Sequence, residues 1–282
     1  MSRTPSAKKL PQPRLDRFAC YELAVTNASR LAPFLAAVHG GRARTLREDF
    51  SGTAATARAW TRLGEGFDAI AVDLDRACLK RAAASFQQET RTHPTGAGTF
   101  AVRIDDVTKC ADRADVISAT NFPLGYFYQR RDLIAYLKHA RRCLRSRGVF
   151  VADIYGGPDA FDVKTQRVAM KIAPGVELRY VWEQREANPR TGRVLNALHF
   201  ELRSRGKQPV IIRDAFVYDW RLWSVPELTD AIREAGFKGV DVYNRLFDAV
   251  DQDGNTYVRP LDDDEPLSDD GGSYVVYVVG RK

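Results

Sequence analysis

The apolar positions of residues 45–157 form two alternating patterns. Short segments rich in apolar and β-branched residues predict strands at 45–50, 68–74, 99–106, 114–122 and 148–157. Segments with apolar residues at helical spacing predict helices at 51–63, 75–89 and 131–148. Strands that alternate with helices of this length indicate right-handed βαβ units around a parallel sheet.

The spacing of apolar residues changes to two after about residue 165. Four alternating segments up to about residue 220 predict an antiparallel patch, with turn-like sequences at 174–175, 188–192 and 204–207. A helix is then predicted over 224–237, where Ser224 and Glu227 have the spacing of a capping box. Strands at 240–246 and 273–281 complete the sheet. We therefore predict an α/β fold: a seven-stranded sheet with helices on both faces, and an antiparallel patch inserted after the fifth strand.

Apolar residues at helical spacing also precede the first strand. They predict one helix over residues 16–39, ended by Gly40. Residues 1–15 contain four basic residues and, up to residue 14, no acidic one, and we expect a disordered basic tail there. Residues 16–282 are expected to form a single domain, with a core of 42–160 and 221–282 and an insert of about 165–220.

Composition excludes several classes of protein. A hydrophobic fraction of 44% and a charged fraction of 28% over 282 residues exclude wholesale disorder, and no apolar run is long enough to span a membrane. The basic N-terminus leads into no apolar segment, so we do not expect it to be a secretory signal. Four scattered cysteines and four isolated histidines predict reduced thiols and no metal site, and we expect a cytoplasmic protein. A net charge of +7 is compatible with a polyanionic partner but does not require one.

Candidate binding residues follow the strands of the predicted sheet. A doubly wound sheet binds its ligand outside the carboxyl ends of its strands. The candidate residues at these ends, taken strand by strand, are Glu48, Phe50, Ser51, Gly52, Asp73, Asp106, Val107, Asn121 and Phe122. Each acidic residue also has a plainer interpretation, because Glu48 can cap a helix and Asp73 and Asp106 can stabilise turns. Their joint placement at consecutive strand ends favours a binding site.

This arrangement resembles the class I S-adenosylmethionine-dependent methyltransferases, with their Rossmann-like fold, over most of residues 45–155 and again over 224–280. The first motif of that family is roughly acid-x-G-x-G-x-G, and it falls here on Glu48, Phe50, Gly52 and Ala54, so only the middle glycine is present. The segments LREDFSGTA and YDWRLWS are also similar to a bacterial methyltransferase subfamily, whose acceptor the likeness does not identify. The resemblance implies S-adenosylmethionine as cofactor.

The resemblance also implies roles for the residues at the strand ends. Glu48 would act on the amino group of the cofactor and Gly52 would allow close approach of its methionine part. Asp73 would bind the ribose hydroxyls. Around the adenine, Asp106 would accept from the amino group, the Val107 amide would meet a ring nitrogen and Leu74 would pack on the ring. Ser51 lies in the same turn, Asn121 and Phe122 would line the cofactor, and Phe50 would point away from it.

A nicotinamide dinucleotide fits these residues less well. Such a cofactor needs a glycine-rich loop and a helix N-terminus open to its diphosphate. Here the loop contains Glu48 and Asp49 and lacks two glycines, which disfavours a diphosphate but suits a sulfonium with an ammonium group.

No catalytic residue is evident, but five residues are candidates for the acceptor site. They are Tyr21, Tyr126, Tyr128, Glu183 and Arg221. The insert is similar in position to the extra strands of glycine N-methyltransferases and amino-sugar N,N-dimethyltransferases, where such strands build part of the acceptor site, and the helix over 16–39 corresponds to a lid. Arg221 could clamp a carboxylate or phosphate, or stack on neighbouring tryptophans and hold the insert in place. Glu183 could hold an ammonium group or pair with a nearby arginine.

The predicted function is S-adenosylmethionine-dependent methyl transfer to nitrogen or oxygen of a small molecule. One alternative is an RNA or protein methyltransferase, because the net charge is +7 and residues 130–147 are strongly basic. The other is a non-catalytic scaffold subunit with a methyltransferase fold, which the missing motif glycines would explain.

Overall fold

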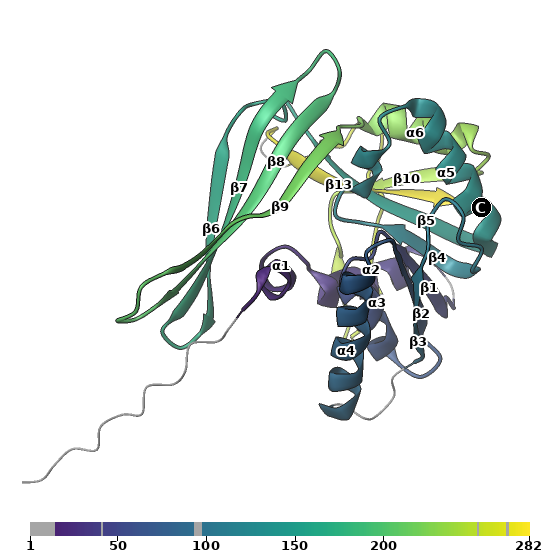
Figure 1. Ribbon diagram of the computed structural model, residues 1–282. Coiled ribbons are helices and arrows are strands. Elements are labelled where there is room, and N and C mark those ends of the chain that lie inside the picture. The colour runs from purple at the N-terminus through teal and green to yellow at the C-terminus, as the bar shows by residue number, and fades with distance from the viewer. Residues whose placement is uncertain (1–14, 41, 93–97, 253, 269–270) are drawn as a thin grey trace, which may run out of the picture.

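The computed structural model describes residues 15–40, 42–92, 98–252, 254–268 and 271–282, so the predicted tail, apart from residue 15, lies outside the described part. Its main layer is a seven-stranded sheet with the order β10-β13-β5-β4-β1-β2-β3 (Figure 1). The strands are β1 (Thr45–Asp49), β2 (Asp68–Asp73), β3 (Phe100–Ile104), β4 (Ala114–Ala119), β5 (Leu144–Gly156), β10 (Gly239–Tyr243) and β13 (Tyr274–Arg281). Strands β1 to β5 pair in parallel, and β13 pairs antiparallel with β5 and β10.

Helices cover both faces of this sheet. The covering helices are α2 (Ala28–Val38), α3 (Ala55–Trp60), α4 (Arg76–Thr92), α5 (Arg130–Cys143) and α6 (Val225–Glu234), with short 3-10 turns η1 (Thr61–Leu63) and η2 (Pro123–Tyr126). A further helix, α1 (Arg17–Ala24), packs on the antiparallel sheet described below. One apolar cluster packs α5 and α6 against the sheet, and a second packs α2, α3 and α4. Among the described residues, no helix has the length and apolar character needed to cross a membrane.

A separate four-stranded antiparallel sheet follows β5 and projects from the core (Figure 1). Its strands are β6 (Thr165–Ala173), β7 (Val176–Asn188), β8 (Arg193–Ser204) and β9 (Val210–Arg221). A separate two-stranded ribbon, β11 (Ala249–Val250) and β12 (Thr256–Tyr257), lies between β10 and β13 in the sequence. Cys20 of α1 packs with Leu178, Phe200 and Ala215 of this sheet in a third apolar cluster. The predicted fold class, with an antiparallel insert after the fifth strand, is confirmed.

The prediction of one N-terminal helix over 16–39 was wrong. The chain forms α1 and α2, with a break at Val25, Thr26 and Asn27, where the backbone N–H groups of Val25 and Thr26 both donate to the carbonyl of Tyr21. Asp16 caps α1 by accepting from Ala19 at 2.9 Å. Because α1 packs on the insert and α2 on the main sheet, the apolar positions continue through the break, and periodicity alone does not reveal it.

Two other predicted helix ends also shift. The helix predicted to end at Gly148 ends at Cys143, because Leu144 already pairs with Ala114 and a bulge with Arg147 at φ 61° follows. The helix predicted from residue 51 begins at Ala55, since the residues before it form a turn with left-handed conformations. That turn shapes the candidate site.

Candidate active site

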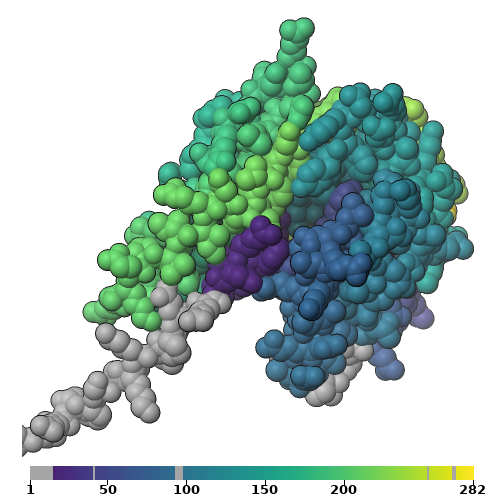
Figure 2. All heavy atoms as spheres, viewed as in Figure 1, coloured from purple at the N-terminus to yellow at the C-terminus, as the bar shows by residue number. Residues whose placement is uncertain are grey.

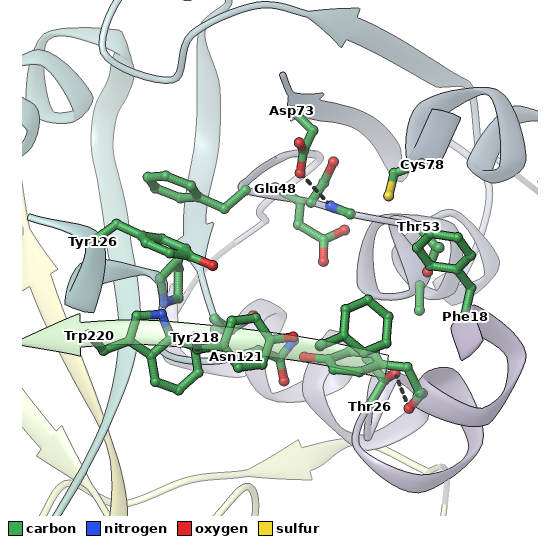
Figure 3. Close-up of a pocket in the computed structure, with 18 residues that line it drawn as sticks. Phe18, Thr26, Glu48, Thr53, Asp73, Cys78, Asn121, Tyr126, Tyr218 and Trp220 are labelled. Atoms are coloured by element: carbon green, nitrogen blue, oxygen red, sulfur yellow. Dashed lines mark hydrogen bonds between the residues drawn. The ribbon is translucent and has the colours of Figure 1, made fainter. Parts of the chain in front are cut away.

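A cavity of about 240 Å³ lies at the carboxyl ends of β1, β2 and β4, between the core and the insert. Figure 3 shows acidic side chains on one side of it and aromatic side chains of β9 on the other. Residues of α1 close one end, and the surface is hollowed between α1 with the insert and the core (Figure 2). The position is the one expected for a ligand site in a doubly wound sheet.

The turn after β1 shapes the cavity through its left-handed backbone. Phe50, Gly52 and Ala54 have φ values of 55°, 52° and 55°. A Cβ atom on Gly52 would meet no atom within 4 Å, so this backbone borders open space in the lining of the cavity. Phe50 also lines the cavity, and its ring lies 6.0 Å from that of Phe127 and 5.8 Å from that of Tyr136. The turn thus exposes backbone where a ligand can approach closely.

Two acidic side chains line the same wall. Glu48 is buried at the end of β1, and its Oε2 accepts the Ala57 backbone N–H at 2.8 Å, so it also caps α3. Burial raises the pKa of Glu48 to about 7. Asp73 ends β2, and its carboxylate accepts the backbone N–H groups of Gly52 at 2.7 Å and Asp75 at 2.8 Å.

Three buried polar atoms in the lining have no hydrogen-bond partner. They are Ser51 Oγ, Thr120 Oγ1 and Trp220 Nε1, on side chains that are 8%, 5% and 2% exposed as whole residues. Buried polar atoms in folded proteins are nearly always paired. A molecule bound in the cavity is placed to pair with them.

The opposite wall is an aromatic stripe on β9. Phe216, Tyr218 and Trp220 alternate along the strand, and the rings of Tyr218 and Trp220 stack at 4.4 Å. Tyr126 meets Trp220 edge-on at 6.2 Å, and Tyr21 meets Phe216 at 5.0 Å. Burial raises the pKa of Tyr21, Tyr126 and Tyr218, so these phenols hold their protons at neutral pH.

Asp153 of β5 supports the loop after β4. Its carboxylate accepts the backbone N–H groups of Asn121 at 2.9 Å and Phe122 at 2.8 Å, both residues with left-handed φ values of 70° and 65°. Burial raises the pKa of Asp153 to about 6. Asn121 lines the cavity, whereas the ring of Phe122 packs on Tyr155 at 5.1 Å and is not part of the lining.

The structure brings together six of the ten predicted binding residues. The lining contains Glu48, Phe50, Ser51, Gly52, Asp73 and Asn121. The expected adenine contacts do not line it: Leu74 is 72% exposed, Val107 is buried in the core, and Asp106 accepts from the backbone and hydroxyl of Thr108. The lining also contains residues that the sequence analysis did not single out, among them Phe18, Thr120, Phe216, Tyr218 and Trp220. The alternation of aromatic residues in β9 places Phe216, Tyr218 and Trp220 on one face of the strand, but it does not show that this face borders the cavity.

Of the five acceptor candidates, Tyr21 and Tyr126 line the cavity and the other three do not. Tyr128 donates its hydroxyl to the Asp219 carbonyl at 2.8 Å. Arg221 lies over the ring of Trp223 at 3.8 Å and donates to the Tyr128 carbonyl at 2.9 Å. Arg221 therefore holds the insert to the core, as in the second of its two interpretations.

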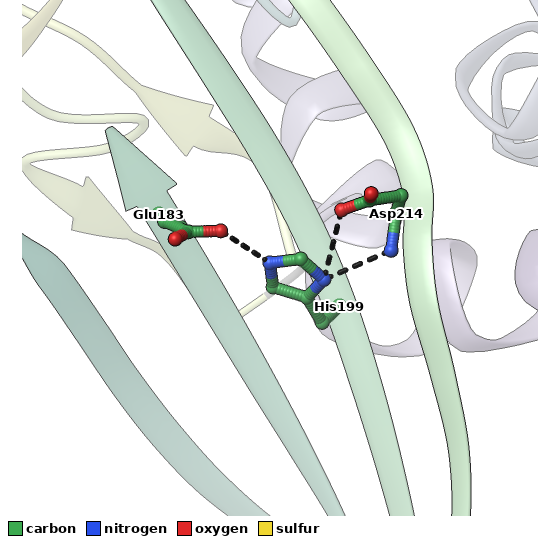
Figure 4. A group of neighbouring side chains, drawn as sticks. All are labelled: Glu183, His199 and Asp214. Carbon is green, nitrogen blue, oxygen red and sulfur yellow. Dashed lines mark hydrogen bonds and ion pairs between the residues drawn. The ribbon is translucent and has the colours of Figure 1, made fainter. Parts of the chain in front are cut away.

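Glu183 lies away from the cavity, in a group with His199 and Asp214 on the insert (Figure 4). His199 contacts Glu183 Oε2 through Nε2 at 2.9 Å and accepts the Asp214 backbone N–H at Nδ1, also at 2.9 Å. Arg185 pairs with both carboxylates, with its Nε 2.9 Å from Glu183. The group could hold a metal ion only if these contacts were broken, because both ring nitrogens are engaged.

No protein-family model matches the sequence, and no curated protein matches it. The fold is similar to that of an S-adenosylmethionine-dependent methyltransferase from Clostridium acetobutylicum, at 14% identity, 92% and 95% coverage of this chain and that one, and a TM-score of 0.63. The sugar N-methyltransferase KedS8 from Streptoalloteichus is similar at 16% identity, 100% and 99% coverage and a TM-score of 0.60. SAM-bound CalS10, an amino pentose methyltransferase from Micromonospora echinaspora, is similar at 13% identity, 97% and 100% coverage and a TM-score of 0.61. The chain therefore has the fold of these S-adenosylmethionine-dependent methyltransferases.

Proposed function

We propose that the protein transfers a methyl group from S-adenosylmethionine to nitrogen or oxygen of a small molecule. The observation that supports this most directly is the cavity itself, in which Glu48 and Asp73 face an aromatic wall at the carboxyl ends of β1 and β2. An acidic and aromatic lining suits a cationic cofactor, because carboxylates and ring faces both attract positive charge. The shared fold supports the same activity.

The residues present fit this cofactor. When bound, S-adenosylmethionine supplies an activated methyl group on a sulfonium. Glu48 would hold the ammonium group of its methionine part, and Gly52 offers backbone that no side chain covers. Asp73 would accept from the ribose hydroxyls, since each carboxylate oxygen can accept a further hydrogen bond. Ser51 Oγ and Thr120 Oγ1 are unpartnered polar atoms in the lining that a bound molecule can satisfy.

The shape of the cavity favours a small acceptor over RNA or protein. Its volume of about 240 Å³ admits a compact molecule beside part of the cofactor. Among the described lining residues there is no lysine, arginine or histidine to contact a phosphate backbone. The adenine end remains a proposal, in which Leu74, Asp106 and Val107 would contact the cofactor where it leaves the cavity along the sheet edge.

Calorimetric titration with S-adenosylmethionine and with S-adenosylhomocysteine tests the proposal. We expect saturable binding of both with dissociation constants on the order of micromolar, and no binding of NAD⁺, which serves as the control. If neither sulfur compound binds, the proposed activity is wrong and the protein is better explained as a scaffold with this fold.

A further inference from the structure

The end of the cavity that would hold the methyl acceptor is aromatic, and none of the described residues that line it has a cationic side chain. Tyr126, Tyr218 and Trp220 surround it, and among the residues that the structure describes in the lining, the only ionisable groups besides tyrosines and Cys78 are the carboxylic acids Glu48 and Asp73. A carboxylate or phosphate on an acceptor would therefore lose its hydration without gaining a positive partner. Burial of an unpaired charge beside two acids is strongly unfavourable.

Two arginines near the cavity are already engaged. Arg58 pairs with Glu22 at 2.8 Å and also with Glu89, and its Nε donates to the Thr53 carbonyl at 3.3 Å. Arg17 donates to the Ala215 carbonyl at 3.2 Å and lies 5.2 Å from the ring centre of Phe216. These contacts would have to break before either guanidinium could bind an anion in the cavity.

The same end also offers no group to take a proton from an alcohol. The hydroxyls of Tyr21, Tyr126 and Tyr218 are protonated phenols, and the carboxylates of Glu48 and Asp73 would be taken up by the ammonium and ribose groups of the proposed cofactor. An alcohol needs a base as it attacks, because its proton is far more tightly held than that of an ammonium ion. A free amine already has its lone pair and needs none.

We infer that the acceptor is an amine that carries no carboxylate or phosphate and lies against Tyr126, Tyr218 and Trp220. This inference rests on the proposed function and narrows it from nitrogen or oxygen to nitrogen. The acceptor enters as an ammonium ion and loses one proton to water, which frees the lone pair that forms the new N–C bond. The electron pair of the breaking C–S bond stays on sulfur, and the methylated ammonium releases a further proton to water. The aromatic faces attract the ammonium form on entry.

Three probes that share a phenethyl group test the charge preference. Phenethylamine, phenethyl alcohol and 3-phenylpropionate are titrated calorimetrically into the full-length protein after saturation with S-adenosylhomocysteine. We expect the amine to bind on the order of tenfold more tightly than the carboxylate, with the alcohol between them. Equal or tighter binding of 3-phenylpropionate, or no binding of the amine, overturns the inference. The first titration separates the two claims, because failure of S-adenosylhomocysteine to bind contradicts the proposed function instead.

Two variants and a matched control locate the probe. Trp220→Leu removes part of the aromatic wall, and Tyr126→Leu removes a ring that is 47% exposed and so not needed for the core. Trp182 lies 6.1 Å from Trp220 but does not line the cavity, so Trp182→Leu is the control. We expect the first two to weaken the amine about tenfold while S-adenosylhomocysteine affinity changes less than about threefold. Unchanged amine affinity in Tyr126→Leu, or an equal loss in Trp182→Leu, contradicts this placement.

Discussion

Asp73 Oδ2 accepts the backbone N–H of Gly52 at 2.7 Å, so the end of β2 is tied to the turn that follows β1. The contact joins the two features that the proposed cofactor would use: a carboxylate with free acceptor capacity and a backbone segment that no side chain covers. It also means that substitution of Asp73 acts on the turn and on the ligand together.

We predict that Asp73→Ala weakens S-adenosylhomocysteine binding by about tenfold to a hundredfold. Two hydrogen bonds to ribose are lost, each worth about 0.5–1.5 kcal/mol, and the Gly52 turn loses its anchor. Asp68→Ala is the matched control, since Asp68 begins the same strand at the opposite end and accepts from Thr99 at 2.8 Å. Calorimetry on both variants checks the prediction. If the two variants bind S-adenosylhomocysteine with equal affinity, Asp73 is not part of the binding site.

Gly52 offers a second test of the same turn. Gly52→Ala places a methyl group at the open lining of the cavity and adds the strain of a left-handed alanine, on the order of 1 kcal/mol. Gly175 in the β6–β7 hairpin has φ +71° and is equally open, so Gly175→Ala carries similar strain away from the cavity. We expect similar losses of stability by urea denaturation but about tenfold weaker S-adenosylhomocysteine binding only in Gly52→Ala. If S-adenosylhomocysteine binding weakens in both variants, the strain of the left-handed alanine is responsible and not the methyl group in the cavity.

Binding should depend on pH through Glu48. Burial raises its pKa to about 7, so the carboxylate that would pair with the ligand ammonium is mostly ionised at pH 8 and mostly protonated at pH 6. We expect S-adenosylhomocysteine to bind about tenfold more tightly at pH 8 than at pH 6. Glu48→Gln should bind weakly and with little pH dependence over this range. If the variant keeps the pH dependence of the original protein, another group is responsible.

The sheet and its strand ends could be predicted from the sequence because both depend on local patterns. Apolar runs such as 68–74 and 114–122 place their last residues at one edge, and parallel strands bring those edges together. Glu48, Gly52 and Asp73 therefore meet in the structure as expected. The segments in which apolar and polar residues alternate likewise indicated the insert. A sheet with one packed face and one solvated face produces this alternation directly in the sequence.

The aromatic wall formed by Phe216, Tyr218 and Trp220 could not be predicted, because its position beside the cavity depends on how the insert packs on the core. Nothing local distinguishes Tyr218, which lines the cavity, from Tyr128, whose hydroxyl bonds to the Asp219 carbonyl. Arg221 lies between two tryptophans in the chain, yet only the orientation of β9 shows that it stacks on Trp223 outside the cavity. The break between α1 and α2 could not be predicted for the same reason, because α1 packs on the insert and α2 packs on the main sheet.

Asp153 holds Asn121 and Phe122 in left-handed conformations, which cost on the order of 1–3 kcal/mol each for residues other than glycine. Its pKa rises from 3.8 to about 6 on burial, so the folded protein binds this proton more tightly than the unfolded chain. The resulting stabilisation is complete below about pH 4 and is lost as the pH rises through 6, a change of about 3 kcal/mol.

We therefore predict that the free energy of unfolding of the original protein, minus that of Asp153→Asn, falls by about 2.4 kcal/mol between pH 4 and pH 7. Urea denaturation at several pH values measures this difference, in which the titration of Glu48 and other shared groups cancels. Asp68→Asn is the control with the opposite sign, because hydrogen bonds from Thr99 lower the pKa of Asp68 and its contribution is lost as the pH falls. A pH-independent difference for Asp153→Asn would show that this carboxylate is ionised throughout and that its two N–H contacts outweigh its burial.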